Sequence, residues 1–206
     1  MKWTERILVL LVALGAILKF TLISGGSVLF LFSLLALITI YFYFSFLLFN
    51  GIRFRHIFKK HAYKGISGLR LAFVILSGFS LSVLLTGVVF KLMYWPGAGV
   101  NLLLGMSACL IVLVLAIIKY FGKKENFYRG IIFRFTPCFV IGFLLYSVNR
   151  QSLVNFQYRN HPQFAKAFIE REEDPSNEEK NKKVEVERDR MHMSPEEFKQ
   201  YHPEEK

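Results

Sequence analysis

The stretch LAFVILSGFSLSVLLTGVVFKLMYWPGAGVNLLLGMSACLIVLVLAIIKYF, residues 71–121, determines the fold class. It contains two apolar runs, at 71–93 and 100–121, joined by a short uncharged turn rich in Gly. At about 1.5 Å per residue, each run is long enough to cross a hydrocarbon core about 30 Å thick as a helix. Only helices satisfy every backbone polar group in lipid over such lengths, and the alternation typical of barrel strands is missing. The stretch therefore predicts a transmembrane helical hairpin.

Three further apolar runs lie at 7–23, 27–49 and 131–148, and the five runs together make up about half of the 206 residues. The chain is 53% hydrophobic with a mean hydropathy of +0.38, which excludes an ordinary soluble domain. We expect an all-α polytopic membrane protein. Its predicted divisions are a first hairpin at 1–50, a basic loop at 51–70, a second hairpin at 71–121, a fifth helix at 131–148 and a charged helical tail at 149–206.

Charge is unevenly distributed along the chain. Residues 1–148 contain 15 Lys and Arg but two acids, Glu5 and Glu125, whereas the tail contains 11 basic and 13 acidic residues. The basic residues lie between apolar runs, where they would face lipid headgroups, so nucleic acid is not the expected partner. The positive-inside rule predicts that the N-terminus and linkers 51–70 and 122–130 are cytoplasmic. Five spans would then place the tail on the outer side of the membrane.

The fifth run is the weakest of the five predicted spans. Arg134, Thr136 and Pro137 all fall in its first half. If this run were re-entrant or lay on the membrane surface, the tail would return to the cytoplasm.

An internal repeat relates the two hairpins at an offset of 72 residues. Gly15, Lys19, Gly25 and Val28 recur as Gly87, Lys91, Gly97 and Val100. Because Lys is rare inside membrane helices, the recurrence of Lys at the same spacing from Gly is not expected by chance and predicts a duplicated hairpin. The repeat also argues against a cleaved signal peptide, the alternative suggested by the basic residues at the N-terminus and the short apolar run after them. We expect the first run to be retained.

The second hairpin resembles a known family over about 40 residues, a fifth of the chain. The matching residues are Gly87 to Lys91, Trp95, Pro96, Gly97, Ala98 and Leu102 to Gly105. They resemble the transmembrane hairpin of GldL, a motor subunit of gliding motility and type IX secretion in the Bacteroidota. The resemblance implies an inner-membrane protein whose hairpins associate with other membrane helices. In that family a protonatable glutamate follows the glycine matched by Gly105; here Cys109 stands there, so motor activity is not implied.

None of the five runs contains Asp, Glu or His, the usual residues of proton-coupled transporters. Their ionisable residues are Lys19, Lys91, Lys119 and Arg134. The favoured interpretation is that the first two snorkel to the outer interface and the last two to the inner one. Alternatively, Lys19 and Lys91 pair with acids of a partner helix or with lipid phosphate.

No catalytic or cofactor motif is recognisable, so we expect neither an enzyme nor a cofactor. Cys109 and Cys138 lie inside apolar runs, which excludes a disulfide framework and a CxxC metal site. A lipid-modifying enzyme would require a cytoplasmic pocket that gathers His56, His61 and Glu125.

The tail has three predicted helix starts: Asn160-His161-Pro162-Gln163, Asp174-Pro175, and the capping box that begins at Ser194. Its segments carry little apolar area, so we expect a tail that is mobile or ordered by a partner. Met191-His192-Met193 offers ligands suited to Cu(I), but adjacent helical residues point in different directions, which favours a solvated helix end.

The leading hypothesis is a non-enzymatic membrane protein that acts by association. Its helices would pack through small residues such as Gly15, Gly87 and Gly105, and its tail would bind a membrane or envelope protein or a second copy of the chain. The alternative is a transporter or channel accessory subunit with Lys19 and Lys91 near an outer vestibule.

Overall fold

The computed structural model describes residues 2–52, 54–57, 59 and 65–203. Over these residues the chain forms nine α-helices and one short 3-10 turn, without a strand, which confirms the predicted all-α class. The chain divides into two compact units, which we call the bundle unit (Met1–Val148) and the tail unit (Asn149–Lys206).

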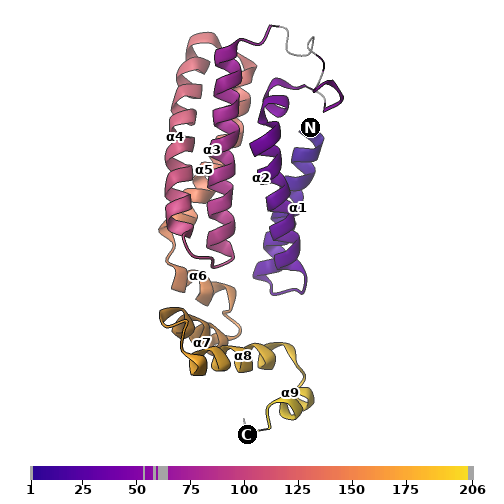
Figure 1. Ribbon diagram of the computed structural model, residues 1–206, viewed down its shortest axis with the longest axis vertical. Coiled ribbons are helices and arrows are strands. Elements are labelled where there is room, and N and C mark those ends of the chain that lie inside the picture. Colours follow the sequence, from indigo (N-terminus) through magenta and orange to yellow (C-terminus); the bar gives the residue numbers. More distant parts are fainter. Residues whose placement is uncertain (1, 53, 58, 60–64, 204–206) are drawn as a thin grey trace. The chain divides into compact units, whose positions relative to one another are not determined.

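The bundle unit contains five long helices connected in antiparallel order (Figure 1). They are α1 (Lys2–Phe20), α2 (Gly26–Asn50), α3 (Gly68–Leu92), α4 (Ala98–Lys123) and α5 (Asn126–Ser147). Helix α1 packs on α2 and α3 on α4, as expected for two hairpins, while α2 joins the hairpins through α3 and α5 packs on α4 and α3. The predicted hairpins and fifth helix are therefore present.

Four of these helices are long and apolar enough to cross a membrane, as a multi-pass membrane protein requires: α2, α3, α4 up to Gly122, and α5. The expected ranking of the spans is reversed. The fifth run forms a continuous helix through Pro137 and belongs to the four. The first run does not, because Glu5, Arg6 and Lys19 all fall within the 19 residues of α1.

The turns of the two hairpins have the same backbone conformation at the predicted offset. Leu22 and Tyr94 both have φ of 58°, and Gly25 and Gly97 have φ of 83° and 78°. The amide of Leu22 donates to Lys19 O and that of Tyr94 to Lys91 O, at 3.2 and 3.4 Å. A positive φ is strained for a leucine or tyrosine, so its recurrence at equivalent positions supports a repeated turn.

The helices of each hairpin also approach each other closely at equivalent glycines. A Cβ added at Gly15 would lie 2.6 Å from the backbone nitrogen of Phe30, and one added at Gly87 would lie 2.7 Å from that of Leu102. Phe30 and Leu102 are themselves 72 residues apart. The repeat of Gly and Lys residues therefore includes the contact between the two helices of each hairpin.

Small residues also bring α2 and α3 together. A Cβ at Gly78 would lie 2.2 Å from Cβ of Ser45, and Ser82 Oγ donates to the carbonyl of Ile38 at 3.2 Å. Both features are typical of membrane helix interfaces, where close backbone approach replaces the hydrophobic driving force.

The tail unit contains α6 (Arg150–Gln157), α7 (Pro162–Glu173), α8 (Glu178–His192) and α9 (Pro195–Tyr201). The predicted capping box at Ser194 is present, and Pro162 begins α7 as expected. The second predicted start was misplaced: Asn177, not Asp174, caps α8, because its side chain accepts the amides of Glu179 and Lys180.

Helices α7 and α8 share a small apolar core, although the sequence suggested too little apolar area for one. Phe164, Ala167 and Val184 are buried there, and Tyr158 and Phe168 pack against them. The aromatic rings of Tyr158 and Phe164 lie 4.6 Å apart edge to face. The tail unit therefore has internal packing of its own.

Candidate functional site

A cluster of three polar side chains joins α1, α2 and α5 inside the bundle unit. Arg134 donates from Nε to Oε1 of Glu5 at 2.6 Å and from Nη2 to Oε2 at 2.8 Å. The hydroxyl of Tyr41 donates to the same Oε1 at 2.9 Å. This is the two-pronged arrangement in which the guanidinium plane matches the carboxylate, the strongest form of the ion pair. We call these residues the ionic cluster.

The ionic cluster lies well inside the bundle. Glu5 is 7% exposed and Tyr41 is 3% exposed. Arg134 is eight residues beyond the start of α5, or about 12 Å along its axis at about 1.5 Å per residue. Its Nη1 donates to the carbonyl of Gly130 at 2.9 Å, and its guanidinium lies 5.3 Å from the ring centre of Phe49. Opposite charges and hydrogen bonds thus compensate each other at a site that is largely buried.

The ionic cluster corrects the expectation that Arg134 snorkels to the inner interface. In the sequence Glu5 precedes the first apolar run, which begins at Ile7, so the apolar pattern predicts that it flanks the helix. In the structure α1 begins at Lys2, so Glu5 is helical and faces Arg134, 129 residues away. A signal was available: an arginine inside an apolar run needs an acid, and residues 1–148 offer two.

The other acid of the bundle unit makes a weaker link. Glu125 precedes α5 and lies 3.8 Å from Nη1 of Arg70, with about two fifths of its side chain exposed. Nε of Arg70 also donates to Oδ1 of Asn50 at 3.1 Å, and the guanidinium lies 3.9 Å from the ring centre of Phe127. Both acids of the unit therefore bind an arginine of another helix, and both links involve α5 or its N-cap residue.

The ion pair of Glu125 also concerns the alternative of a lipid-modifying enzyme, which requires a pocket shared by Glu125, His56 and His61. The structure brings Glu125 to Arg70, while His56 ends the 3-10 turn Phe54–His56. His61 lies outside the described residues.

The repeated lysines occupy equivalent places in the bundle. Lys91 donates from Nζ to the carbonyl of Val148, the C-cap of α5, at 2.7 Å. Nζ of Lys19 lies 5.6 Å from the ring centre of Tyr94, which follows the end of α3. Each lysine sits in the last turn of its own helix and reaches the C-terminal end of the next helix that runs in the same direction (Figure 1). A cation there is favourable, because helix C-termini carry partial negative charge.

The lysines therefore do not behave as expected. Lys19 is 5% exposed, so the prediction that it snorkels outward is wrong. Lys91 is half-buried and bound to a carbonyl of its own chain.

The remaining motif residues shape the turns and helix contacts. Gly25 and Gly97 are the left-handed N-caps of α2 and α4. Trp95 is 43% exposed with its ring 5.3 Å from that of Phe90, next to the exposed Pro96. A Cβ at Gly105 would lie 2.4 Å from Cα of Leu84, which explains the glycine by close packing of α3 on α4.

Neither cysteine points to a bound metal. Both are free thiols, and Cys109 is fully buried on α4. No group of three His, Cys, Asp or Glu suited to a metal ion occurs among the described residues. Within Met191-His192-Met193, His192 is exposed while its neighbours are half-buried, as adjacent helical residues were expected to diverge.

Comparisons of the chain with protein-family models, with curated proteins and with solved structures found no match.

Proposed function

We propose that this chain is a non-enzymatic inner-membrane protein that acts by association, with a helical bundle that holds a tail for an envelope or membrane protein partner. The observation that carries the proposal is the pairing of charge inside the bundle. Both acids of the bundle unit bind arginines, and Lys91 binds a helix end. Charged groups used in this way fix helices to one another, which suits a scaffold.

The outer surfaces of the bundle support a role within lipid or against other membrane helices. Large apolar side chains are exposed on α1, α4 and α5, among them Leu10, Ile17, Ile111, Ile118, Phe133 and Leu144. Such a surface is stable in a bilayer and can also pack against a partner helix. A homo-oligomer is one form that this association can take.

The predicted topology gives the tail its proposed side. The basic linkers before α3 and before α5 favour a cytoplasmic location for the starts of both helices. Helix α5 then delivers the tail unit to the periplasm. The side of the tail is then the same whether or not α1 crosses the membrane.

The resemblance to the GldL hairpin supports the proposed association of the bundle with other membrane helices. It also supports a location in the inner membrane and a source among the Bacteroidota. The close approaches at Gly87 and Gly105 occur in the part of the chain that carries it. The motor activity of that family is not proposed, because Cys109 replaces its glutamate.

The transporter-accessory alternative has less support. It needs Lys19 and Lys91 near an open vestibule, yet Lys19 is 5% exposed and Lys91 binds the carbonyl of Val148.

The proposal is tested by paired reporters and by crosslinking in cells. Reporter domains fused after Lys206, one active only in the periplasm and one only in the cytoplasm, should give a periplasmic signal; a cytoplasmic signal overturns the topology. A photo-crosslinking residue at Phe156 or Tyr201, which are 58% and 70% exposed, should yield one discrete adduct with an envelope or membrane protein. The matched control is the same residue at Leu69, 80% exposed in the bundle unit. Absence of any discrete adduct from both tail positions overturns association through the tail.

A further inference from the structure

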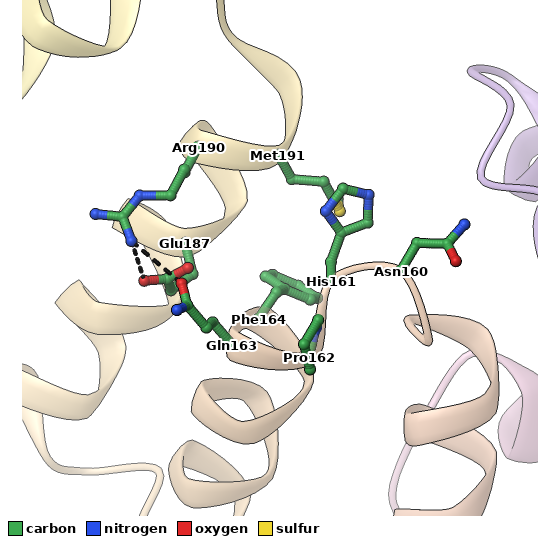
Figure 2. A pocket seen from close by; sticks show the side chains of 8 residues that line it. All are labelled: Asn160, His161, Pro162, Gln163, Phe164, Glu187, Arg190 and Met191. Atoms are coloured by element: carbon green, nitrogen blue, oxygen red, sulfur yellow. Dashed lines mark hydrogen bonds and ion pairs between the residues drawn. The ribbon is translucent and has the colours of Figure 1, made fainter. Parts of the chain in front are cut away.

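A pocket in the tail unit lies between the start of α7 and the end of α8 (Figure 2). Its lining comes from two segments: Asn160, His161, Pro162, Gln163 and Phe164 on one side, and Glu187, Arg190 and Met191 on the other. Nothing in the proposed scaffold role uses this pocket.

The polar groups on one side of the pocket bind each other. Nη1 of Arg190 donates to Oε1 of Glu187 at 2.9 Å and to Oε1 of Gln163 at 3.4 Å. Figure 2 shows this group turned away from His161. The charge of Arg190 is therefore already compensated, which makes it a poor anchor for an additional anion.

The other side of the pocket brings together an imidazole and a thioether. Figure 2 shows the Met191 side chain extending toward the His161 ring, and both residues line the same pocket. His161 is the N-cap residue of α7, but its side chain does not cap that helix. Across the part of the chain that the structure describes, no hydrogen bond or ion pair engages the His161 ring. Both side chains are half-buried, so a bound ion would be partly shielded from water.

We infer that His161 and Met191 form a binding site for a soft monovalent cation, Cu(I). Thioether sulfur selects soft ions such as Cu(I), and neutral imidazole is a common partner ligand for copper. Zinc would require about four ligands and calcium at least six oxygens, neither of which this side of the pocket supplies.

The site differs from the one suggested by the sequence alone. Met191, His192 and Met193 are adjacent and diverge, whereas His161 is the N-cap residue of α7 and Met191 lies in α8, 30 residues apart in sequence. The fold of α7 against α8 creates this pair. The inference rests on the tail unit alone and is independent of the proposed scaffold role.

The test uses Ag(I), a redox-inert substitute for Cu(I), added to the full chain in detergent with ¹³C-methyl methionine. The chain has five methionines, and Met191→Leu assigns the relevant resonance while nearly preserving side-chain volume. Ag(I) should shift the Met191 methyl resonance. Because changing even an outer-shell partner typically weakens metal affinity about 10–100-fold, His161→Ala should weaken Ag(I) binding at least about tenfold. The matched control His192→Ala should leave the affinity within about twofold, since that exposed residue does not line the pocket.

Two features of the design keep the outcomes distinct. Cys109 and Cys138 also bind silver, so the titration is repeated with both changed to alanine, and the methyl resonance reports the pocket in each background. The backbone resonance of Val184, in the core of α7 and α8, reports whether the tail remains folded, and His161→Gln replaces His161→Ala if it moves. An Ag(I) shift of Met193 that depends on His192 overturns the inference, as does unchanged affinity in a folded His161 variant.

Discussion

Replacing Glu5 by alanine should destabilise the bundle unit strongly, because it leaves Arg134 buried without its carboxylate. The two side chains are 9% and 20% exposed and share two hydrogen bonds of 2.6 and 2.8 Å. Removing one partner of such a buried pair costs about 3–5 kcal/mol. Tyr41 loses its acceptor at the same time, which adds to the loss. We therefore expect a decrease of at least about 3 kcal/mol in the free energy of unfolding.

The compensating double variant distinguishes a charge effect from a general loss of packing. Glu5→Leu with Arg134→Met replaces the pair by apolar side chains of similar size, and such replacements are often neutral or stabilising. The double variant should therefore be more stable than either single change. Glu125→Ala is the matched control, since its pair is partly exposed at 3.8 Å and should contribute less than about 1 kcal/mol.

The assay is equilibrium unfolding of the full chain in detergent, followed by Trp fluorescence and by thermal melting. A loss of about 3 kcal/mol corresponds to a decrease in Tm of about 6–12 °C for a unit of this size. If Glu5→Ala and Arg134→Ala each changed stability by less than about 0.5 kcal/mol and were additive, the reasoning about the ionic cluster would be refuted.

Three further predictions concern packing, charge and the hairpin turns. Gly105→Ala should lower the free energy of unfolding by about 1–3 kcal/mol through its clash with Leu84, while Gly99→Ala, with no atom within 4 Å, should not lower it. The hydrogen bond from Lys183 lowers the pKa of the Glu170 carboxyl below its usual 4.5, so this stabilisation is complete above that value and lost as the pH falls through the lower folded pKa. An NMR titration should show the lowered pKa, and Lys183→Gln should raise it. Leu22→Gly should relieve the positive φ and leave stability equal or higher in the same melting assay.

The repeat gives the two hairpins a shared design with different surroundings. Lys91 meets the carbonyl at the end of α5, whereas Lys19 meets the ring of Tyr94 at the end of α3. The same residue type at the same position thus reaches the next parallel helix in both cases. If Lys19→Met and Lys91→Met change the stability by different amounts, the difference would therefore reflect the groups that each lysine contacts and not the conformation of the turn.

Local signals in the sequence predicted much of this structure. Apolar runs with short Gly-rich turns predicted both hairpins, and the recurrence of Gly and Lys predicted a duplicated hairpin, whose turns at Gly25 and Gly97 share one backbone conformation. The box at Ser194 predicted the start of α9. These features depend on residues close together in the chain, where spacing and helix geometry suffice.

The two errors of ranking had a common cause. The pattern of apolar residues alone leaves Glu5 outside the first helix and gives Arg134 no partner, so it ranks the first run too high as a span and the fifth too low. A charge in an apolar helix is strongly destabilising only when it has no partner of opposite charge. The partner of Arg134 is Glu5 on α1, 129 residues away in sequence, and no local pattern indicates that pairing.

The sequence by itself determined the all-α class, the lengths of the apolar helices, the hairpin pairing and the uneven distribution of charge, because each follows from composition and from spacing along one helix. Tertiary structure alone decided which charges meet. It placed Glu5 against Arg134 and Tyr41, Lys91 against the end of α5, and His161 beside Met191 across two helices of the tail. The physical reason is that burial and pairing depend on the rotation and depth of each helix against its neighbours, which are set by the packing of whole faces and not by any single segment.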